Sequence, residues 1–220
     1  MRNLAAEGIV EGVHNVGDVM YDALLYNLGL AEQRSKVLGS LGLEPGRYLL
    51  STLHRPDNTD QPENLRKILA AFEEIEEPII FPVHPRTRHR MAEFGLSNAH
   101  SAIPAPLNQE DIQPGRNPRF IDPVGYLDML VLEKNARMIL TDSGGMQKEA
   151  YWLGVPCLTL RTETEWVETV EMGWNVVVGV DPKNIVEAVR GFNPRGDRSE
   201  VFEDGKASRR IVAVLEGAQQ

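Results

Sequence analysis

Residues 141–149 combine small polar side chains, two glycines and a carboxylate in a spacing that suits the binding of a phosphate and a diol. The sequence there is Thr-Asp-Ser-Gly-Gly-Met-Gln-Lys-Glu. An apolar run at 138–140 precedes it and helix-forming residues follow as far as Leu153, so the pattern predicts a strand, a tight turn and a helix. Gly144 and Gly145 allow a close backbone approach, and the unpaired amides that open the helix form a receptor for phosphate.

Polar side chains on the same predicted helix extend this receptor. Glu149 lies four residues after Gly145, where its carboxylate can accept hydrogen bonds from vicinal sugar hydroxyls, and Gln147 offers an adaptable amide nearby. With Ser143 at the turn, the segment has the anion receptor and the diol acceptor that a nucleoside diphosphate needs. The simpler interpretation is a structural turn, because short glycine motifs also occur by chance.

Two further polar clusters follow predicted strands. His54-Arg-Pro-Asp-Asn58 comes after the apolar run 48–53, and His84-Pro-Arg86 comes after 79–83. Because ligands of open parallel sheets bind outside the carboxyl ends of the strands, we expect both clusters to lie beside residues 141–145. His54 is the candidate for proton transfer or phosphate binding, the alternative being a histidine bonded to a loop carbonyl. His84 is either a ligand residue or part of a rigid loop before Pro85.

Residues 161–168, Arg-Thr-Glu-Thr-Glu-Trp-Val-Glu, gather three carboxylates and a tryptophan after the next predicted strand. One interpretation is a loop and short helix that close over the sugar or the base of a ligand, with Glu165 and Trp166 as contacts. The other is an acidic helix cap with Trp166 packed beneath it. The residues alone leave both open.

Strand and helix signals alternate from residue 48 onward, which predicts an α/β fold with a doubly wound parallel sheet. The predicted strands are 48–53, 79–83, 119–121, 138–140, 156–160 and 175–178, and the predicted helices are 63–74, 87–94, 126–135, 144–153, 182–189 and 207–216. Residues 96–118 are expected to form a long surface connection. Residues 13–16 resemble a strand and 19–28 a helix, so we interpret 1–18 as the remnant of another domain and 19–220 as the main domain.

The composition restricts the class of protein. The 220 residues are 42% hydrophobic and 25% charged, and the net charge of −9 argues against a nucleic-acid partner. Cys157 is the single cysteine, which excludes an internal disulfide and a multi-cysteine metal site. No His, Asp and Glu spacing resembles a metal site, and no cofactor is expected. The acidic residues near the N-terminus argue against a signal peptide, so we expect a cytoplasmic protein.

These motifs, in this order, resemble the C-terminal half of the non-hydrolysing UDP-N-acetylglucosamine 2-epimerases. The matching segments are 54–58, Pro82-Val-His-Pro85, Asp142 to Ala150, Gly154-Val-Pro156 and Thr162 to Glu165. The resemblance implies a Rossmann-like domain of the B-type glycosyltransferase fold. It also implies inversion at C2 of a UDP-HexNAc, by elimination of UDP to a glycal and its re-addition.

The resemblance assigns roles to the residues that match. Ser143, Gly144 and Gly145 are expected to hold the diphosphate, Glu149 the ribose, and His54 is expected to assist departure of UDP. The UDP-binding set is completed by His84 and Gln147, and the expected substrate contacts are Arg55, Asn58, Asp142, Glu165 and Trp166. Asp57 stands where many members carry Glu, and Trp166 where many bacterial members carry Arg.

The residues that handle the C2 proton lie in the family's N-terminal domain, which this chain does not contain. The resemblance therefore implies a UDP-binding half that needs an N-terminal partner for turnover and that assembles as an oligomer. Three alternatives stay open: an epimerase for a modified UDP-sugar such as a diacetamido uronate, the donor domain of a B-type glycosyltransferase, and a non-catalytic UDP-sugar-binding module.

Overall fold

The computed structural model describes residues 2–96, 117–194, 198 and 204–217. Six parallel strands form one sheet in the order β3-β2-β1-β4-β5-β6. The strands are β1 (Leu49–Thr52), β2 (Ile79–Pro82), β3 (Arg119–Ile121), β4 (Met138–Thr141), β5 (Cys157–Thr159) and β6 (Asn175–Val177). The order runs outward from β1 to β3 and then from β4 to β6, which confirms the predicted doubly wound sheet.

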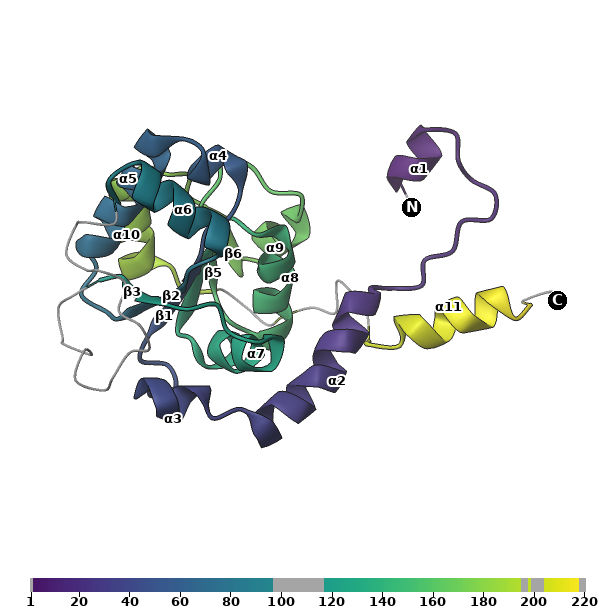
Figure 1. Ribbon diagram of the computed structural model, residues 1–220. Coiled ribbons are helices and arrows are strands. Elements are labelled where there is room, and N and C mark those ends of the chain that lie inside the picture. The colour runs from purple at the N-terminus through teal and green to yellow at the C-terminus, as the bar shows by residue number, and fades with distance from the viewer. Residues whose placement is uncertain (1, 97–116, 195–197, 199–203, 218–220) are drawn as a thin grey trace. The chain divides into compact units, whose positions relative to one another are not determined.

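Helices cover both faces of this sheet (Figure 1). On one face α5 (Pro62–Glu73) and α10 (Pro182–Gly191) pack against each other, with α4 (Pro56–Thr59) and α6 (Pro85–Glu93) beside α5. On the other, α3 (Val37–Leu41), α7 (Tyr126–Asn135), α8 (Gly144–Leu153) and α9 (Val167–Glu171) pack in series. This arrangement follows from right-handed crossovers, because the chain reverses its direction across the sheet between β3 and β4.

The central strands are apolar because both of their faces are covered. The side chains of β2 and β4 are all buried, and Leu49 and Leu50 of β1 are completely so. α5 contributes Leu65, Ile68, Leu69 and Phe72 at helical spacing, and these pack in one cluster with strand residues such as Phe81, Met138, Leu140 and Leu158. Pro62 begins α5, where the amide that proline lacks would have no partner within the helix.

The predicted strands and long helices between residues 48 and 194 are confirmed within a few residues at their ends. One prediction near the N-terminus is wrong: residues 13–16 form no strand, since an isolated apolar pair has no neighbouring strand to bond with. The helix expected at 19–28 begins at the predicted residue and continues to Arg34 as α2 (Val19–Arg34). α3 and α4 are short helices that the sequence pattern did not indicate. Most of the expected connection at 96–118 lies outside the described residues.

The chain divides into two compact units, 1–29 with 200–220 and 30–199, and the division falls within α2. In the first unit, Asp22 accepts hydrogen bonds from the amides of Ala207 (3.0 Å) and Ser208 (2.7 Å) at the start of α11 (Ala207–Leu215). Gly205 has φ +71°, and a Cβ there would lie 2.5 Å from Leu25 Cδ1, so this turn requires glycine. α1 (Arg2–Ala6) belongs to the same unit.

None of the described helices is both long enough and apolar enough to span a bilayer.

Candidate functional site

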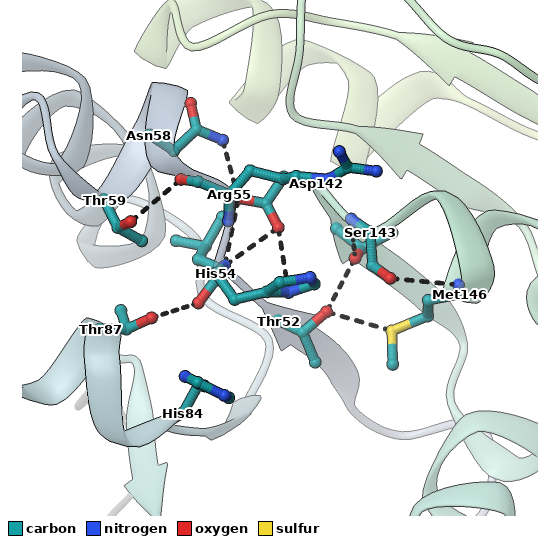
Figure 2. A network of polar contacts seen from close by, with 12 residues as sticks. Thr52, His54, Arg55, Asn58, Thr59, His84, Thr87, Asp142, Ser143 and Met146 are labelled. Atoms are coloured by element: carbon teal, nitrogen blue, oxygen red, sulfur yellow. Dashed lines mark hydrogen bonds and ion pairs between the residues drawn. The ribbon is translucent and has the colours of Figure 1, made fainter.

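The carboxyl ends of β1, β2 and β4 bring the three predicted polar clusters to one edge of the sheet. Thr52 pairs with Thr141 in the parallel register of β1 and β4, so the residues after each strand emerge side by side. Their hydroxyl oxygens are 2.7 Å apart. Figure 2 shows His54, Arg55 and Asn58 around Asp142, with Ser143 and His84 close by. The predicted convergence of these clusters is confirmed.

Asp142 connects the segment after β4 to the segment after β1. Its carboxylate has no exposed surface and accepts hydrogen bonds from the amides of His54 (3.1 and 3.2 Å) and Arg55 (3.1 Å). The side-chain amide of Asn58 donates a further bond (3.1 Å) and also bonds the carbonyl of Leu160 (2.9 Å). A carboxylate with this many donors fixes the position of the histidine loop.

His54 is held by the same carboxylate. Its Nδ1 lies 3.5 Å from Asp142 Oδ1, and its side chain is 42% exposed. With Nδ1 facing an acceptor, Nε2 is the ring nitrogen directed away from the buried carboxylate, as the histidine of a hydrolase triad is oriented by its aspartate. The ring can therefore present Nε2 to a bound group while Asp142 holds its orientation.

His84 presents its ring differently. It caps α6, and its Nδ1 accepts a hydrogen bond from the amide of Arg86 (3.2 Å). The proton of the neutral ring therefore resides on Nε2, which makes His84 a donor toward a ligand. The centroids of the His54 and His84 rings are 6.1 Å apart.

Ser143 and the two glycines form the start of α8. Ser143 caps the helix, with its Oγ 3.4 Å from the amide of Met146, and its own amide bonds Thr141 Oγ1 (2.9 Å). The amide of Gln147 bonds the Ser143 carbonyl (3.2 Å), so Gly144 and Gly145 precede the first amide that bonds within the helix. Their amides and the positive end of the helix dipole are the groups on which the prediction of an anion receptor rests.

Side chains surround the space above Gly144. A Cβ on this residue would lie 3.2 Å from Trp166 Nε1 and 3.5 Å from both Arg55 Nη2 and Glu165 Oε2. A Cβ on Gly145 would meet only Ser143 Oγ, at the ordinary contact distance of 3.8 Å. Of the two glycines, Gly144 is thus the one that keeps space open beside polar side chains.

Trp166 packs over the amine of Lys148, whose Nζ lies 4.1 Å from the centre of the indole ring. Lys148 is itself buried and also contacts the Trp152 ring at 5.3 Å. The cation–π contact joins the loop after β5 to α8. Trp166 was predicted from the sequence and Lys148 was not. The sequence feature that could have indicated Lys148 is its position one helical turn before Trp152.

Gln147 lies inside the protein. Its Oε1 accepts hydrogen bonds from Thr164 Oγ1 (2.5 Å) and from Asn175 Nδ2 (3.3 Å), and its side chain has no exposed surface. It thereby anchors the loop that carries Glu165 and Trp166. Asn58, Asp142 and Gln147 were expected to contact ligand. Their ligand contacts stay a prediction, and the structure gives all three a positioning role within the protein.

Glu149 lies on α8 at the contact with α7. Tyr126 Oη donates to Glu149 Oε1 over 3.4 Å, and burial raises the pKa of Glu149 although Tyr126 and Lys148 act in the opposite direction. Its neighbour Glu133, which was not among the predicted site residues, is 1% exposed and has no hydrogen-bond partner for either carboxylate oxygen among the described residues. Burial, and then the charge of Glu149, raise the pKa of Glu133 well above its ordinary value. The sequence feature that could have indicated Glu133 is its position three residues after Leu130, on the buried face of α7.

Comparison with known proteins identifies the family. The family model for UDP-N-acetylglucosamine 2-epimerase matches residues 1–216. The chain belongs to the UDP-N-acetylglucosamine 2-epimerase family. A "UDP-N-acetylglucosamine 2-epimerase homolog" from Methanococcus maripaludis is 49% identical over 215 residues, which cover 97% of this chain and 57% of that protein.

Two further relatives of this epimerase-family chain have names that state a ligand or a substrate. The crystal structure of a Methanocaldococcus jannaschii UDP-GlcNAc 2-epimerase, in complex with UDP-GlcNAc and UDP, is 40% identical with a TM-score of 0.83, and the match covers 98% of this chain and 58% of that one. The UDP-2,3-diacetamido-2,3-dideoxy-D-glucuronate 2-epimerase of Pseudomonas aeruginosa is 38% identical over 220 residues, 98% of this chain and 56% of that protein. The chain thus spans somewhat more than half the length of its relatives.

Proposed function

We propose that this chain is the UDP-binding half of an enzyme that interconverts UDP-GlcNAc and UDP-ManNAc. The observation that carries the proposal is the anion receptor at Gly144, which lies beside Arg55 and the His54–Asp142 pair at one edge of the sheet. Such an arrangement suits a diphosphate, and the M. jannaschii relative holds UDP and UDP-GlcNAc. Glu149, further along α8, is the residue that we expect to accept hydrogen bonds from the ribose hydroxyls.

The proposed reaction begins with loss of the C2 proton and cleavage of the bond between C1 and the phosphate oxygen. The electron pair of that bond leaves with UDP, and a C1–C2 double bond forms in the sugar. Negative charge then grows on the diphosphate, where the amides of Gly144 and Gly145, the Arg55 guanidinium and the His54 ring stabilise it. Re-addition of UDP to C1, with a proton delivered to the opposite face of C2, completes the inversion. By family resemblance, the groups that move the C2 proton belong to the part of the enzyme outside this chain.

A modified UDP-sugar is the second candidate substrate. The P. aeruginosa relative named for a diacetamido glucuronate is almost as similar in sequence as the M. jannaschii enzyme. Trp166, at the rim of the space above Gly144, is the side chain through which we expect the two substrates to be distinguished.

We also propose that a second domain, on this chain or on a partner chain, packs against the first compact unit. Helices α2 and α11 carry exposed apolar side chains in this unit: Val19, Met20, Leu25 and Tyr26 on α2, and Val212 and Leu215 on α11. Water-exposed apolar side chains in this number are typical of an interaction surface. An oligomer and a cytoplasmic location are further parts of the proposal, and the oligomer rests on the family resemblance.

Calorimetric titration with UDP tests the proposal, with Glu149→Gln as the variant and Glu187→Gln as its control. Glu187 is an exposed residue of α10 that pairs with Lys183. We expect UDP to bind the wild type and the control equally, and the Glu149 variant about tenfold or more weakly. A chain that binds no UDP contradicts the proposal.

An epimerisation assay with UDP-GlcNAc, with and without the N-terminal half of a relative, then separates the alternatives. Turnover only when that half is added supports the proposal. Binding without turnover in both cases favours a non-catalytic module, and transfer of the sugar to an added acceptor favours a glycosyltransferase.

A further inference from the structure

The carboxylate of Glu165 lies beside the anion receptor at the start of α8. Its Oε2 is 3.5 Å from the position of a Cβ on Gly144, which is also where Arg55 Nη2 and the indole nitrogen of Trp166 approach. A ligand phosphate on the amides of Gly144 and Gly145 would enter the same space. One carboxylate of the protein therefore occupies part of the region that the proposed function gives to a diphosphate.

Two guanidinium groups face this carboxylate. Arg161 Nη1 donates to both Glu165 oxygens, at 3.0 and 2.8 Å, while Arg55 Nη2 is 3.9 Å from Oε1. Carboxylates and phosphates are bound by the same donors, namely guanidinium groups and the amides of a helix N-terminus. Two guanidinium groups of the kind that would bind a phosphate thus face Glu165, Arg161 at hydrogen-bond distance and Arg55 at 3.9 Å.

The backbone around Glu165 is anchored, whereas its side chain is not enclosed. Thr164 Oγ1 donates to the buried amide oxygen of Gln147 (2.5 Å) and accepts from the amide of Trp166 (3.0 Å), so the residues on both sides are held. The side chains of Glu165 and Arg55 are 50% and 39% exposed. Rotation of these two side chains can open the receptor without any movement of the loop backbone.

We propose that Glu165 is an internal anion that neutralises Arg55 and the α8 receptor in the ligand-free chain and gives way to the diphosphate when UDP binds. This inference rests on the proposed function. The exchange makes and breaks no covalent bond: Arg55 leaves the carboxylate for the diphosphate, and Glu165 keeps its two shorter contacts with Arg161. Glu165 then weakens UDP binding, which is the opposite of the effect of a residue that contacts the ligand.

The experiment is a calorimetric titration of the wild type, Glu165→Gln and Glu163→Gln with UDP and, separately, with uridine. Glu163 is an exposed acid of the same loop, so its replacement removes the same charge without reaching Gly144. We expect Glu165→Gln to bind UDP about three- to tenfold more tightly, as loss of an exposed ion pair predicts. Uridine binding should be unchanged in both variants, because uridine has no phosphate.

Unchanged or weaker UDP binding by Glu165→Gln, with the wild type binding UDP, overturns this inference and leaves the proposed function in place. An equal gain in Glu163→Gln also overturns it, because the effect would then be one of net charge. Absence of UDP binding by all three proteins overturns the inference and the proposed function together. Thermal unfolding of each variant confirms that the compared proteins are folded.

Discussion

Two buried carboxylates on either side of β4 have opposite surroundings. Asp142, directly after β4, accepts hydrogen bonds from two backbone amides and the side chain of Asn58. Glu133, on the helix before β4, is equally buried but has no hydrogen-bond partner among the residues that the structure describes, and it faces a second acid, Glu149. Burial alone therefore does not determine whether an acidic residue stabilises the fold.

The difference lies in the donors. Backbone and amide N–H groups replace the hydration that Asp142 loses on burial, so its carboxylate holds the histidine loop against β4. Glu133 lacks such donors among the described residues, and burial raises its pKa. The edge of the sheet that carries the candidate site is thus held together by hydrogen bonds to a carboxylate, whereas the contact between α7 and α8 contains a carboxyl group without that compensation.

The largest effect is expected from Asp142→Ala. This change leaves the amides of His54 and Arg55 and the amide group of Asn58 without their acceptor, so we expect the free energy of unfolding to fall by about 3–5 kcal/mol. Urea denaturation measures it. Asp142→Asn keeps one acceptor oxygen and should lose less, and an Asp142→Ala protein of unchanged stability would contradict the role given to this carboxylate.

Glu133→Met should raise the free energy of unfolding, and by less than Asp142→Ala lowers it. Folding raises the pKa of Glu133, so its carboxyl group contributes stability below its unfolded pKa and loses that contribution as the pH rises through its folded pKa. Removing the group should therefore stabilise the protein at pH ~8, by about 1–3 kcal/mol, and change it little at pH ~5.

Denaturant unfolding at the two pH values checks the Glu133 prediction, with Glu187→Met, at an exposed position of α10, as the matched control. Equal destabilisation of Glu133→Met at both pH values would show that the carboxyl group is satisfied and would remove the contrast with Asp142.

Tyr126→Phe should have the smallest effect. The contact between Tyr126 Oη and Glu149 is 3.4 Å long and lies near the surface, so we expect a change in unfolding free energy of less than about 0.5 kcal/mol. Because this hydrogen bond lowers the pKa of Glu149, its loss should move the pKa of Glu149 slightly upward. Titration of the Glu149 carboxyl carbon by NMR measures that shift, and a downward movement would contradict it.

The sequence was sufficient for the sheet and for the place of the site. Buried parallel strands appear as short apolar runs, and residues after such strands meet at one edge, so His54, His84 and Ser143 could be brought together from chain order alone. The exact ends of elements and the short helices α3 and α4 were not predictable in this way, because they depend on contacts distant in sequence.

The roles within the site were harder to predict. Asp142 and Gln147 are polar residues at a functional edge, which favours ligand contact, but the structure buries both beneath the loops that they hold. Their hydrogen-bond donors are the side chains of Asn58 for Asp142 and Thr164 for Gln147, which come from other segments of the chain. Glu133 could not be distinguished from a solvated acid, since only the packing of α7 on α8 shows that it is buried.

The most direct test of the UDP receptor is a calorimetric titration with UDP of the wild type, Gly144→Ala and Gly145→Ala. A Cβ at Gly144 would enter the space bounded by Trp166, Arg55 and Glu165, whereas one at Gly145 meets only Ser143 Oγ at 3.8 Å. We expect the wild type to bind UDP, Gly144→Ala to bind it at least about tenfold more weakly, and Gly145→Ala to be the less affected variant. A wild-type chain that does not bind UDP, or a Gly144→Ala protein that binds it as tightly as the wild type, would contradict the account.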